Sequence, residues 1–181
     1  MQARGKWVAA SFSVMLLAGW VSAASGQDRF DVRIANDIAR QIDGYAQYSI
    51  FDHVSGSVDD GVVTLTGKVT MPYKKTDIGR RAQQVAGVRE VRNNVEVLPV
   101  SPYDEDLRLR IARAIYGNSA FWQYAARANP PIHIIVDRGH VTLVGVVSSN
   151  VDRMLARSLA TGFGELSVTN DLRTDAEMRS E

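Results

Sequence analysis

Cysteine is absent from this sequence of 181 residues. Without a thiol, the chain has no disulfide framework, no zinc–thiolate site and no cysteine nucleophile, and it lacks the lipidated residue of a lipoprotein. An excess of one charge is missing too, because 21 Lys and Arg residues nearly balance 20 Asp and Glu residues. The net charge of +1 provides no strong field that would attract nucleic acid or an anionic membrane by charge alone.

Long apolar runs are confined to the N-terminus. Arg4 and Lys6 precede an apolar stretch from Trp7 to Val21, and small residues follow as far as Gly26. This order is typical of a secretory signal peptide, and the apolar part is short for a membrane span. We therefore predict a signal peptide at 1–23, with cleavage after Ala23 or shortly downstream, and export to the periplasm. An uncleaved membrane anchor is the alternative.

A repeat divides the rest of the chain into two halves. Residues 58–69, VDDGVVTLTGKV, return as residues 136–147, VDRGHVTLVGVV, at an offset of 78. Flanking matches recur at an offset of 77. Upstream of the hairpin, Ile34 and Ile38 match Ile111 and Ile115. Downstream, Val91, Asn93 and Val95 match Val168, Asn170 and Leu172. Matches at three places in one order predict two tandem copies of one unit, called module one and module two below.

Each module has the pattern of an α+β unit with the order α-β-β-α-β. Periodicity predicts helices over 31–43, 73–86, 104–116 and 150–161, and strands over 51–59, 62–70, 88–98, 132–137, 140–148 and 165–173. We expect each module to be a three-stranded mixed sheet with two helices on one face. The modules occupy 28–98 and 103–174, a short proline-containing linker separates them, and 175–181 forms a polar tail.

Glycines mark the hairpin of each module. Gly61 follows Asp60, and Gly139 follows Arg138, where a two-residue turn requires positive φ. Gly67 and Gly145 fall within the second strand of each hairpin. We expect these two glycines to lie where a helix crosses the sheet, with no room for a side chain.

These motifs resemble those of BON domains, a family named from bacterial osmotic-stress and nodulation proteins. The hairpin V-x-x-G-x-V-x-L-x-G-x-V stands at 58–69 and again at 136–147, and the closing G-V-x-x-V-x-N-x-V stands at 87–95. Module two departs at 164–170, where no valine directly follows the glycine. The resemblance implies a tandem BON-domain protein in the periplasm, without catalysis, that associates with phospholipid or the envelope.

No pattern in the sequence requires an active site or a cofactor. Gly61 and Gly67 are not followed by the Lys-Ser/Thr pair of a phosphate-binding loop. The hairpin register places His133 opposite Val144 and Asp137 opposite His140, so the histidines do not converge on a metal, and Asp137 and His140 form a cross-strand polar pair. The GXXG loop of nucleic-acid-binding KH modules is absent. We predict no enzyme, cofactor, metal or nucleic acid.

Two surfaces are candidates for binding. The first is the aromatic segment at 118–127, in which Phe121, Trp122, Tyr124 and Arg127 suit a membrane interface, although the rings could equally close the core. The second is on module two, where Ile135, Val144 and Val146 replace polar residues of module one on the outer face of the sheet. Such a patch is usually covered, either by module one or by a lipid or protein partner.

One further surface is basic. Lys74, Lys75, Arg80 and Arg81 lie on the second helix of module one, where we expect an ordinary solvated face, with a headgroup-binding patch as the alternative.

The preferred function is non-catalytic binding at the cell envelope, most directly to a phospholipid surface, in support of envelope integrity. An adaptor that docks on an envelope or secretion assembly is the alternative of a different class, and a hydrolase with an unrecognised site is a weaker one. The lipid, the protein partner and the oligomeric state stay open.

Overall fold

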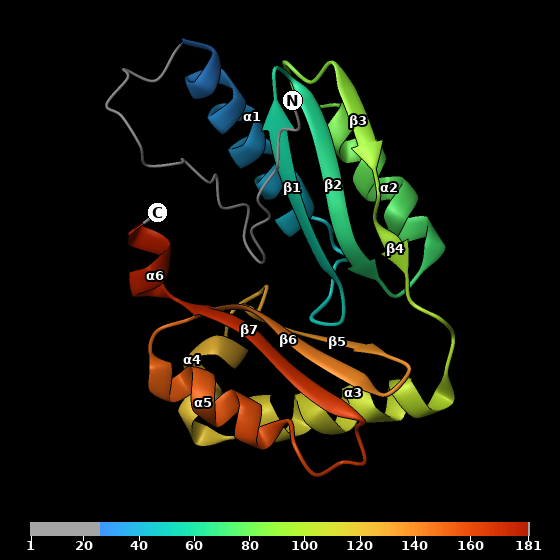
Figure 1. Ribbon diagram of the computed structural model, residues 1–181, viewed down its shortest axis with the longest axis vertical. Helices are drawn as coiled ribbons and strands as arrows, with labels where there is room; N and C mark the ends of the chain where they lie inside the picture. Colours follow the sequence, from blue (N-terminus) through green and yellow to red (C-terminus); the bar gives the residue numbers. More distant parts are fainter. Residues whose placement is uncertain (1–25, 181) are drawn as a thin grey trace, which may run out of the picture.

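The computed structural model describes residues 26–180, and the expected signal peptide at 1–23 lies outside them. Two α+β modules follow one another along the chain, as the repeat predicts (Figure 1). None of the helices among the described residues is long and apolar enough to cross a membrane.

Module one contains the helices α1 and α2 and a mixed sheet. Its elements are α1 (Gly26–Asp43), β1 (His53–Asp59), β2 (Val62–Val69), α2 (Pro72–Gln83), β3 (Glu90–Asn93) and β4 (Glu96–Val97). The central strand β2 pairs antiparallel with β1 and parallel with β3 and β4. The predicted third strand is divided into β3 and β4. Asn93, at the end of β3, donates through its side chain to the Lys75 carbonyl of α2 at 2.8 Å.

Module two repeats this arrangement with additions. Its elements are α3 (Pro102–Tyr116), the 3-10 turn η1 (Ser119–Phe121), α4 (Trp122–Ala125), β5 (Ile132–Asp137), β6 (His140–Val147), α5 (Asn150–Leu159), β7 (Ser167–Thr174) and α6 (Asp175–Arg179). The central strand β6 pairs antiparallel with β5 and parallel with β7. Residues 175–179 of the expected polar tail form α6, whose N-terminus is capped by a reciprocal capping box of Thr174 and Glu177.

The hairpins follow the predicted register. Asp59 pairs with Val62 and Asp137 with His140, so each hairpin closes on a two-residue turn. Both residues of each turn have positive φ, 48° and 72° in module one and 51° and 79° in module two. The alternation of apolar residues then directs one face of each sheet to the helices, where each core lies.

The expectation that helices press on Gly67 and Gly145 is wrong. A Cβ at Gly67 would lie 2.1 Å from the carbonyl oxygen of His53, and one at Gly145 would lie 1.8 Å from that of Pro131. Both glycines also have positive φ, 119° and 134°. The glycines are therefore required by the close approach of the neighbouring edge strand's backbone.

The modules are docked against each other. In Figure 1 α3, α4 and α5 lie beneath the sheet of module two, on the side away from module one. The open face of that sheet is turned toward the start of β1 and the end of β2. Leu98, which ends module one, forms a buried apolar cluster with Ile135 and Val144 on this face. Module one is thus the cover of the apolar patch, and Val146 beside it is half-buried.

Candidate functional site

The aromatic segment divides between the core and the surface. Phe121 and Tyr124 are in the core of module two, whereas Trp122 and Arg127 are exposed. The Tyr124 hydroxyl accepts from the backbone N–H of Ser148 and contacts the Asp152 carboxylate, both at 2.8 Å. Because these contacts hold Tyr124 inward, only Trp122 and Arg127 of the four predicted residues are available to a partner.

An exposed surface of module two gathers large apolar side chains next to arginines. Trp122 on α4 and Val151 and Met154 on α5 are each 72% exposed. The hydrogen bond from Tyr124 to Asp152 joins α4 to the first turn of α5, and Arg153 and Arg157 line a shallow hollow with Met154. This set is called the helical surface below, and it comprises Trp122, Val151, Arg153, Met154 and Arg157.

The boundary between the modules contains polar contacts as well as the apolar cluster. Lys68 of β2 forms an ion pair with Asp137 of β5, and the hydrogen bond from Lys68 lowers the pKa of Asp137. The backbone N–H of Ile134 donates to the carbonyl of Ile50 at 2.7 Å, so the loop before β1 satisfies part of the edge of β5. Phe51 of the same loop packs on the core of module two.

The predicted polar pair of Asp137 and His140 is replaced by other partners. The two residues are opposite in the register, as predicted. The Asp137 carboxylate, however, pairs with Lys68, and the His140 Nδ1 lies 2.8 Å from the Ser167 hydroxyl. Sequence reasoning could not find the Lys68 contact because it joins residues of different modules.

Two histidines meet at this boundary. His53 of β1 and His133 of β5 have ring centroids 6.0 Å apart, and Tyr48 lies 5.5 Å from His133. Burial, followed by the nearby charge of His133, lowers the pKa of His53 to about 3. Burial also lowers the pKa of His133, against the effect of backbone hydrogen bonds to Asp52 and Ser49. Across residues 26–180 no group of three or more acidic or histidine side chains is placed to hold a metal ion.

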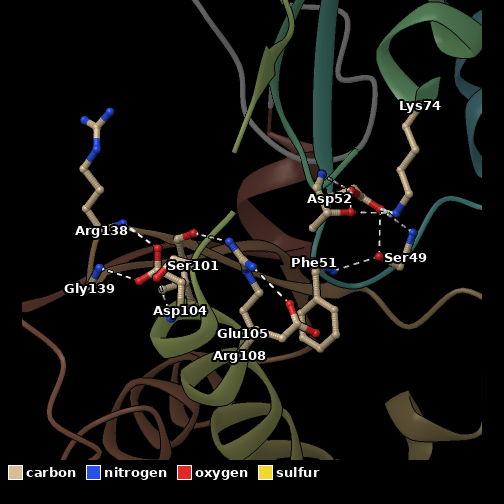
Figure 2. A network of polar contacts seen from close by, with 12 residues as sticks. Ser49, Phe51, Asp52, Lys74, Ser101, Asp104, Glu105, Arg108, Arg138 and Gly139 are labelled. Atoms are coloured by element: carbon tan, nitrogen blue, oxygen red, sulfur yellow. Dashed lines mark hydrogen bonds and ion pairs between the residues drawn. The ribbon is translucent and has the colours of Figure 1, made fainter. Parts of the chain in front are cut away.

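A buried ion pair lies next to the boundary in module one. Asp52 and Lys74 are 0% and 6% exposed, and the Lys74 ammonium donates to the Asp52 carboxylate at 2.6 Å (Figure 2). Burial raises the pKa of Asp52, but hydrogen bonds from Lys74, Thr70 and Ser49 outweigh it and hold that pKa below its usual value. The expectation of a solvated face on α2 is therefore wrong for Lys74.

Module two builds the equivalent contact without an ion pair. Ser148 and Asp152 occupy the positions of Thr70 and Lys74 at the repeat offset. The Tyr124 hydroxyl takes the place of the Asp52 carboxylate, because it binds both Ser148 and Asp152. The same junction between the sheet and a helix N-terminus is thus held by different chemistry in the two modules.

A second acidic contact is common to both modules. Asp104 of α3 is buried and accepts from the backbone N–H groups of Arg138 and Gly139, at 2.9 and 2.8 Å (Figure 2). Asp31 of α1 accepts in the same way from Asp60 and Gly61. These carboxylates attach the first helix of each module to its hairpin turn, so Asp31 and Asp104 have a structural role.

A cleft of about 730 Å³ separates the open faces of the two sheets. Module one contributes part of β1 and β2, and module two contributes β5, β6, the turn between them and part of β7. The wall residues include apolar, hydroxyl, imidazole and charged side chains: His53, Ser55, Thr66, Lys68, Ile135, Asp137, Arg138, His140, Thr142, Val144 and Asp171. It is called the interdomain cleft below.

A family model for the BON domain matches residues 30–99 and 104–176. The chain belongs to the BON-domain family. BON domains are typical of non-catalytic proteins of the bacterial periplasm and envelope, and the paired match agrees with the sequence repeat and with the two docked modules. No curated protein matches the chain.

Two solved structures with distant similarity belong to CdsD of Chlamydia trachomatis, a structural protein of its type III secretion system. One is 15% identical, covers 80% of this chain and 94% of its own, and has a TM-score of 0.30. The other, a C-terminal domain, is 12% identical, covers 75% of this chain and 94% of its own, and has a TM-score of 0.28. TM-scores this low do not support any inference about the fold or the function of this chain.

Proposed function

We propose that this chain is a non-catalytic binding protein of the cell envelope that associates with phospholipid through the helical surface of module two. The observation that carries the proposal is the exposure of Trp122, Val151 and Met154 on adjoining helices. Large apolar side chains that stay exposed on neighbouring helices mark a surface that a partner or a membrane can cover. The patch of Ile135 and Val144 is not free for this role, because Leu98 packs on it.

The chemistry of the helical surface fits a lipid interface. Tryptophan favours the depth of the headgroups, where an apolar ring and a polar N–H are both satisfied. Arg157 makes no ion pair with any residue of 26–180, and arginine can bury its stem while its head contacts phosphate. Each such cation contributes about 1 kcal/mol near an anionic membrane surface.

Vesicle flotation tests this function. We expect the exported form, which should begin near Ala24 or Gln27, to float with vesicles of phosphatidylethanolamine and phosphatidylglycerol. The double variant Trp122→Gln with Met154→Gln should remain in the dense fraction, because the apolar anchors are removed at positions that the core does not use. The control is Val100→Gln with Leu166→Gln, two strongly exposed apolar residues elsewhere, which should float normally.

Two results would contradict the proposal. If the Trp122 and Met154 variant floats as well as the original chain, the helical surface is not the contact. If the original chain fails to float while its circular dichroism shows it folded, phospholipid association is wrong, and the adaptor function becomes the better explanation.

A further inference from the structure

We infer that the outer edge of β1 is a docking site for a second copy of this chain, which adds its own β1 as an antiparallel strand about a twofold axis. β1 is the outermost strand of the module-one sheet (Figure 1). An edge strand has a row of backbone N–H and C=O groups that another strand can bind. The inference does not rest on the proposed phospholipid function, because no residue of the helical surface belongs to β1.

The hairpin register decides which backbone groups of β1 point outward. Asp59 and Val62 flank the two-residue turn, so they form a hydrogen-bonded pair, and hydrogen-bonded pairs alternate along the ladder from there. The odd-numbered residues of β1 therefore bond to β2. The backbone N–H and C=O groups of Val54, Gly56 and Val58 point away from β2, toward the open side of the sheet.

The equivalent edge of module two, on β5, is already occupied. Three groups of the chain itself cover it: the Tyr116 hydroxyl, the Ile50 carbonyl and the Arg108 guanidinium. The tyrosine hydroxyl lies 3.1 Å from the N–H of Ile132 and 2.5 Å from its carbonyl oxygen. The N–H of Ile134 donates to Ile50 at 2.7 Å, and the carbonyl of Val136 accepts from Arg108 at 2.6 Å.

The edge of β1 has one such cover. The Tyr48 hydroxyl accepts from the Val54 N–H at 3.0 Å. The outward N–H and C=O groups of Gly56 and Val58 form no hydrogen bond with any residue of 26–180. β1 also contains no proline or lysine, the residues that commonly protect an edge strand from pairing. Two donors and two acceptors are thus left for a partner strand.

The opposite edges of the two sheets are better protected. In module one that edge is divided between β3, of four residues, and β4, of two. In module two the side chains of Asn170 and Glu177 accept from the N–H groups of Leu172 and Thr174 along β7. Short strands and groups already bound to side chains pair poorly with another strand. Of the four edges in residues 26–180, that of β1 is therefore the best suited to pairing.

A second β1 fits this edge when the twofold axis passes between the two Ser57 residues. Gly56 of each copy then lies opposite Val58 of the other, and the two residues exchange N–H···O=C bonds. All four free groups of each chain are satisfied, and the pairing ends before Val54, where Tyr48 already binds the N–H. Each copy uses the same residues, as a twofold dimer interface requires.

The side chains that meet in this register are complementary. Gly56 has no side chain, so it leaves room beside Val58 of the second copy, which lies on the face that packs against the core. Ser55 lies opposite Asp59, whose exposed carboxylate can accept from the serine hydroxyl. Ser57 lies opposite itself, which joins two small hydroxyl side chains. The strand thus matches its own copy in both backbone and side chains.

Sedimentation equilibrium of the exported form, at chain concentrations from about 1 µM to about 1 mM, measures this association. We expect the mass to double as the concentration rises. Hydrogen exchange over the same range identifies the surface. The amides of Gly56 and Val58 should exchange more slowly at high concentration, whereas the Ser57 amide, which bonds to β2, should be protected at every concentration.

A disulfide tests the register. Because the chain contains no cysteine, one introduced cysteine can form a disulfide only between copies. Ser57 lies opposite itself in a non-hydrogen-bonded pair, where the Cα atoms are about 4.5 Å apart and a disulfide fits. Ser57→Cys should therefore crosslink in oxidised glutathione. The matched control is Thr64→Cys, opposite Ser57 on β2, whose copies are about 14 Å apart across three strand spacings.

Charge at Ser57 tests the pairing without a covalent bond. Ser57→Lys and Ser57→Glu each place like charges opposite each other, at an exposed position, and each should weaken association about fivefold. An equal mixture of the two variants should restore association, because lysine then faces glutamate. Thr64→Lys, the same change on β2, should associate normally. Circular dichroism shows that each variant is folded.

Three results would overturn the inference. The mass of a single chain at every concentration would leave the edge to a strand from a different protein. Unchanged association in both Ser57→Lys and Ser57→Glu would place the contact elsewhere. Equal crosslinking of Thr64→Cys would mean that collision, not pairing, forms the disulfide. The Trp122 and Met154 variant should still dimerise whatever flotation shows, so this inference and the proposed function can fail separately.

Discussion

His53 and His133 face each other across the boundary between the two BON modules, with ring centroids 6.0 Å apart. Both side chains are buried, and burial favours the neutral form of each ring. Two imidazolium ions at this distance would repel each other in a medium of low dielectric constant. The docking of the modules is therefore tied to the protonation state of a pair that neither module contains by itself.

The free energy that holds the modules together should fall in mild acid. Docking lowers the pKa of His53 from its ordinary value of 6.5 to about 3. The neutral ring therefore stabilises the docked state fully above pH 6.5, and this stabilisation decreases as the pH falls from 6.5 toward 3. At pH 5 the loss is about 2 kcal/mol for His53, with a further loss from His133. Small-angle X-ray scattering between pH 7.5 and pH 4.5 should show the radius of gyration increase.

Several groups share the surroundings of the pair. Asp43, Tyr48 and Arg127 line a small pocket together with both histidines, and the Asp52–Lys74 pair lies next to them. Histidine variants therefore isolate the cause. His53→Gln with His133→Gln should remove most of the pH dependence, and His140→Gln, at an exposed histidine, should leave it unchanged. Equal pH dependence in all three proteins would exclude the buried pair as the cause.

The buried charges of module one should be strongly coupled. Lys74→Met leaves the Asp52 carboxylate buried without its cation, which should lower the free energy of unfolding by about 3–5 kcal/mol. The double variant Asp52→Asn with Lys74→Met should recover part of that loss, because asparagine is uncharged and its single side-chain oxygen can still accept from Thr70. Urea denaturation measures both. Lys75→Met, at the neighbouring lysine of α2, is the control and should change stability by less than about 0.5 kcal/mol.

The equivalent junction in module two should be less costly to break. Tyr124→Phe removes only the hydroxyl that binds Ser148 and Asp152 and keeps the ring in the core. We expect a loss of about 1–3 kcal/mol, because no buried charge is left without a partner. A loss as large as that of Lys74→Met would show that the Tyr124 hydroxyl is more than a neutral substitute for the carboxylate.

The hairpin glycines should tolerate no side chain. At Gly145 a Cβ would lie 1.8 Å from the Pro131 carbonyl oxygen, and φ is 134°. Gly145→Ala should therefore lower stability by about 3 kcal/mol or more, through overpacking and backbone strain together. Gly162 has a φ of 97°, and no atom lies within 4 Å of the position that its Cβ would take, so Gly162→Ala should cost only about 1–2 kcal/mol in thermal melts.

Charge at the apolar boundary should separate the modules. Val144→Asp places a carboxylate against Leu98 and Ile135 in a buried apolar cluster. We expect calorimetry to resolve two transitions in place of one, as each module unfolds independently. Thr64→Asp makes the same change on the open face of module one, outside the interdomain cleft, and should keep the single transition. A single transition in Val144→Asp would mean that the apolar cluster does not hold the modules together.

The local sequence was sufficient to predict the module and its repetition. The register of each hairpin, the positive φ of Asp60-Gly61 and Arg138-Gly139, and the two apolar cores follow from alternation, helical spacing and turn residues. These features depend on neighbours within about a dozen residues, so a linear pattern contains them. The same patterns indicated that Ile135 and Val144 must be covered, and left open what covers them.

Only the tertiary structure decided how the modules use their surfaces. The contacts of His53 with His133, Lys68 with Asp137 and Leu98 with Val144 join residues from different modules. No periodicity links such positions, because their meeting depends on the relative orientation of two sheets. Sequence alone predicted two tandem modules of one fold. The docking of those modules buries one predicted surface and creates the interdomain cleft, since burial is a property of the packed molecule and not of the residue.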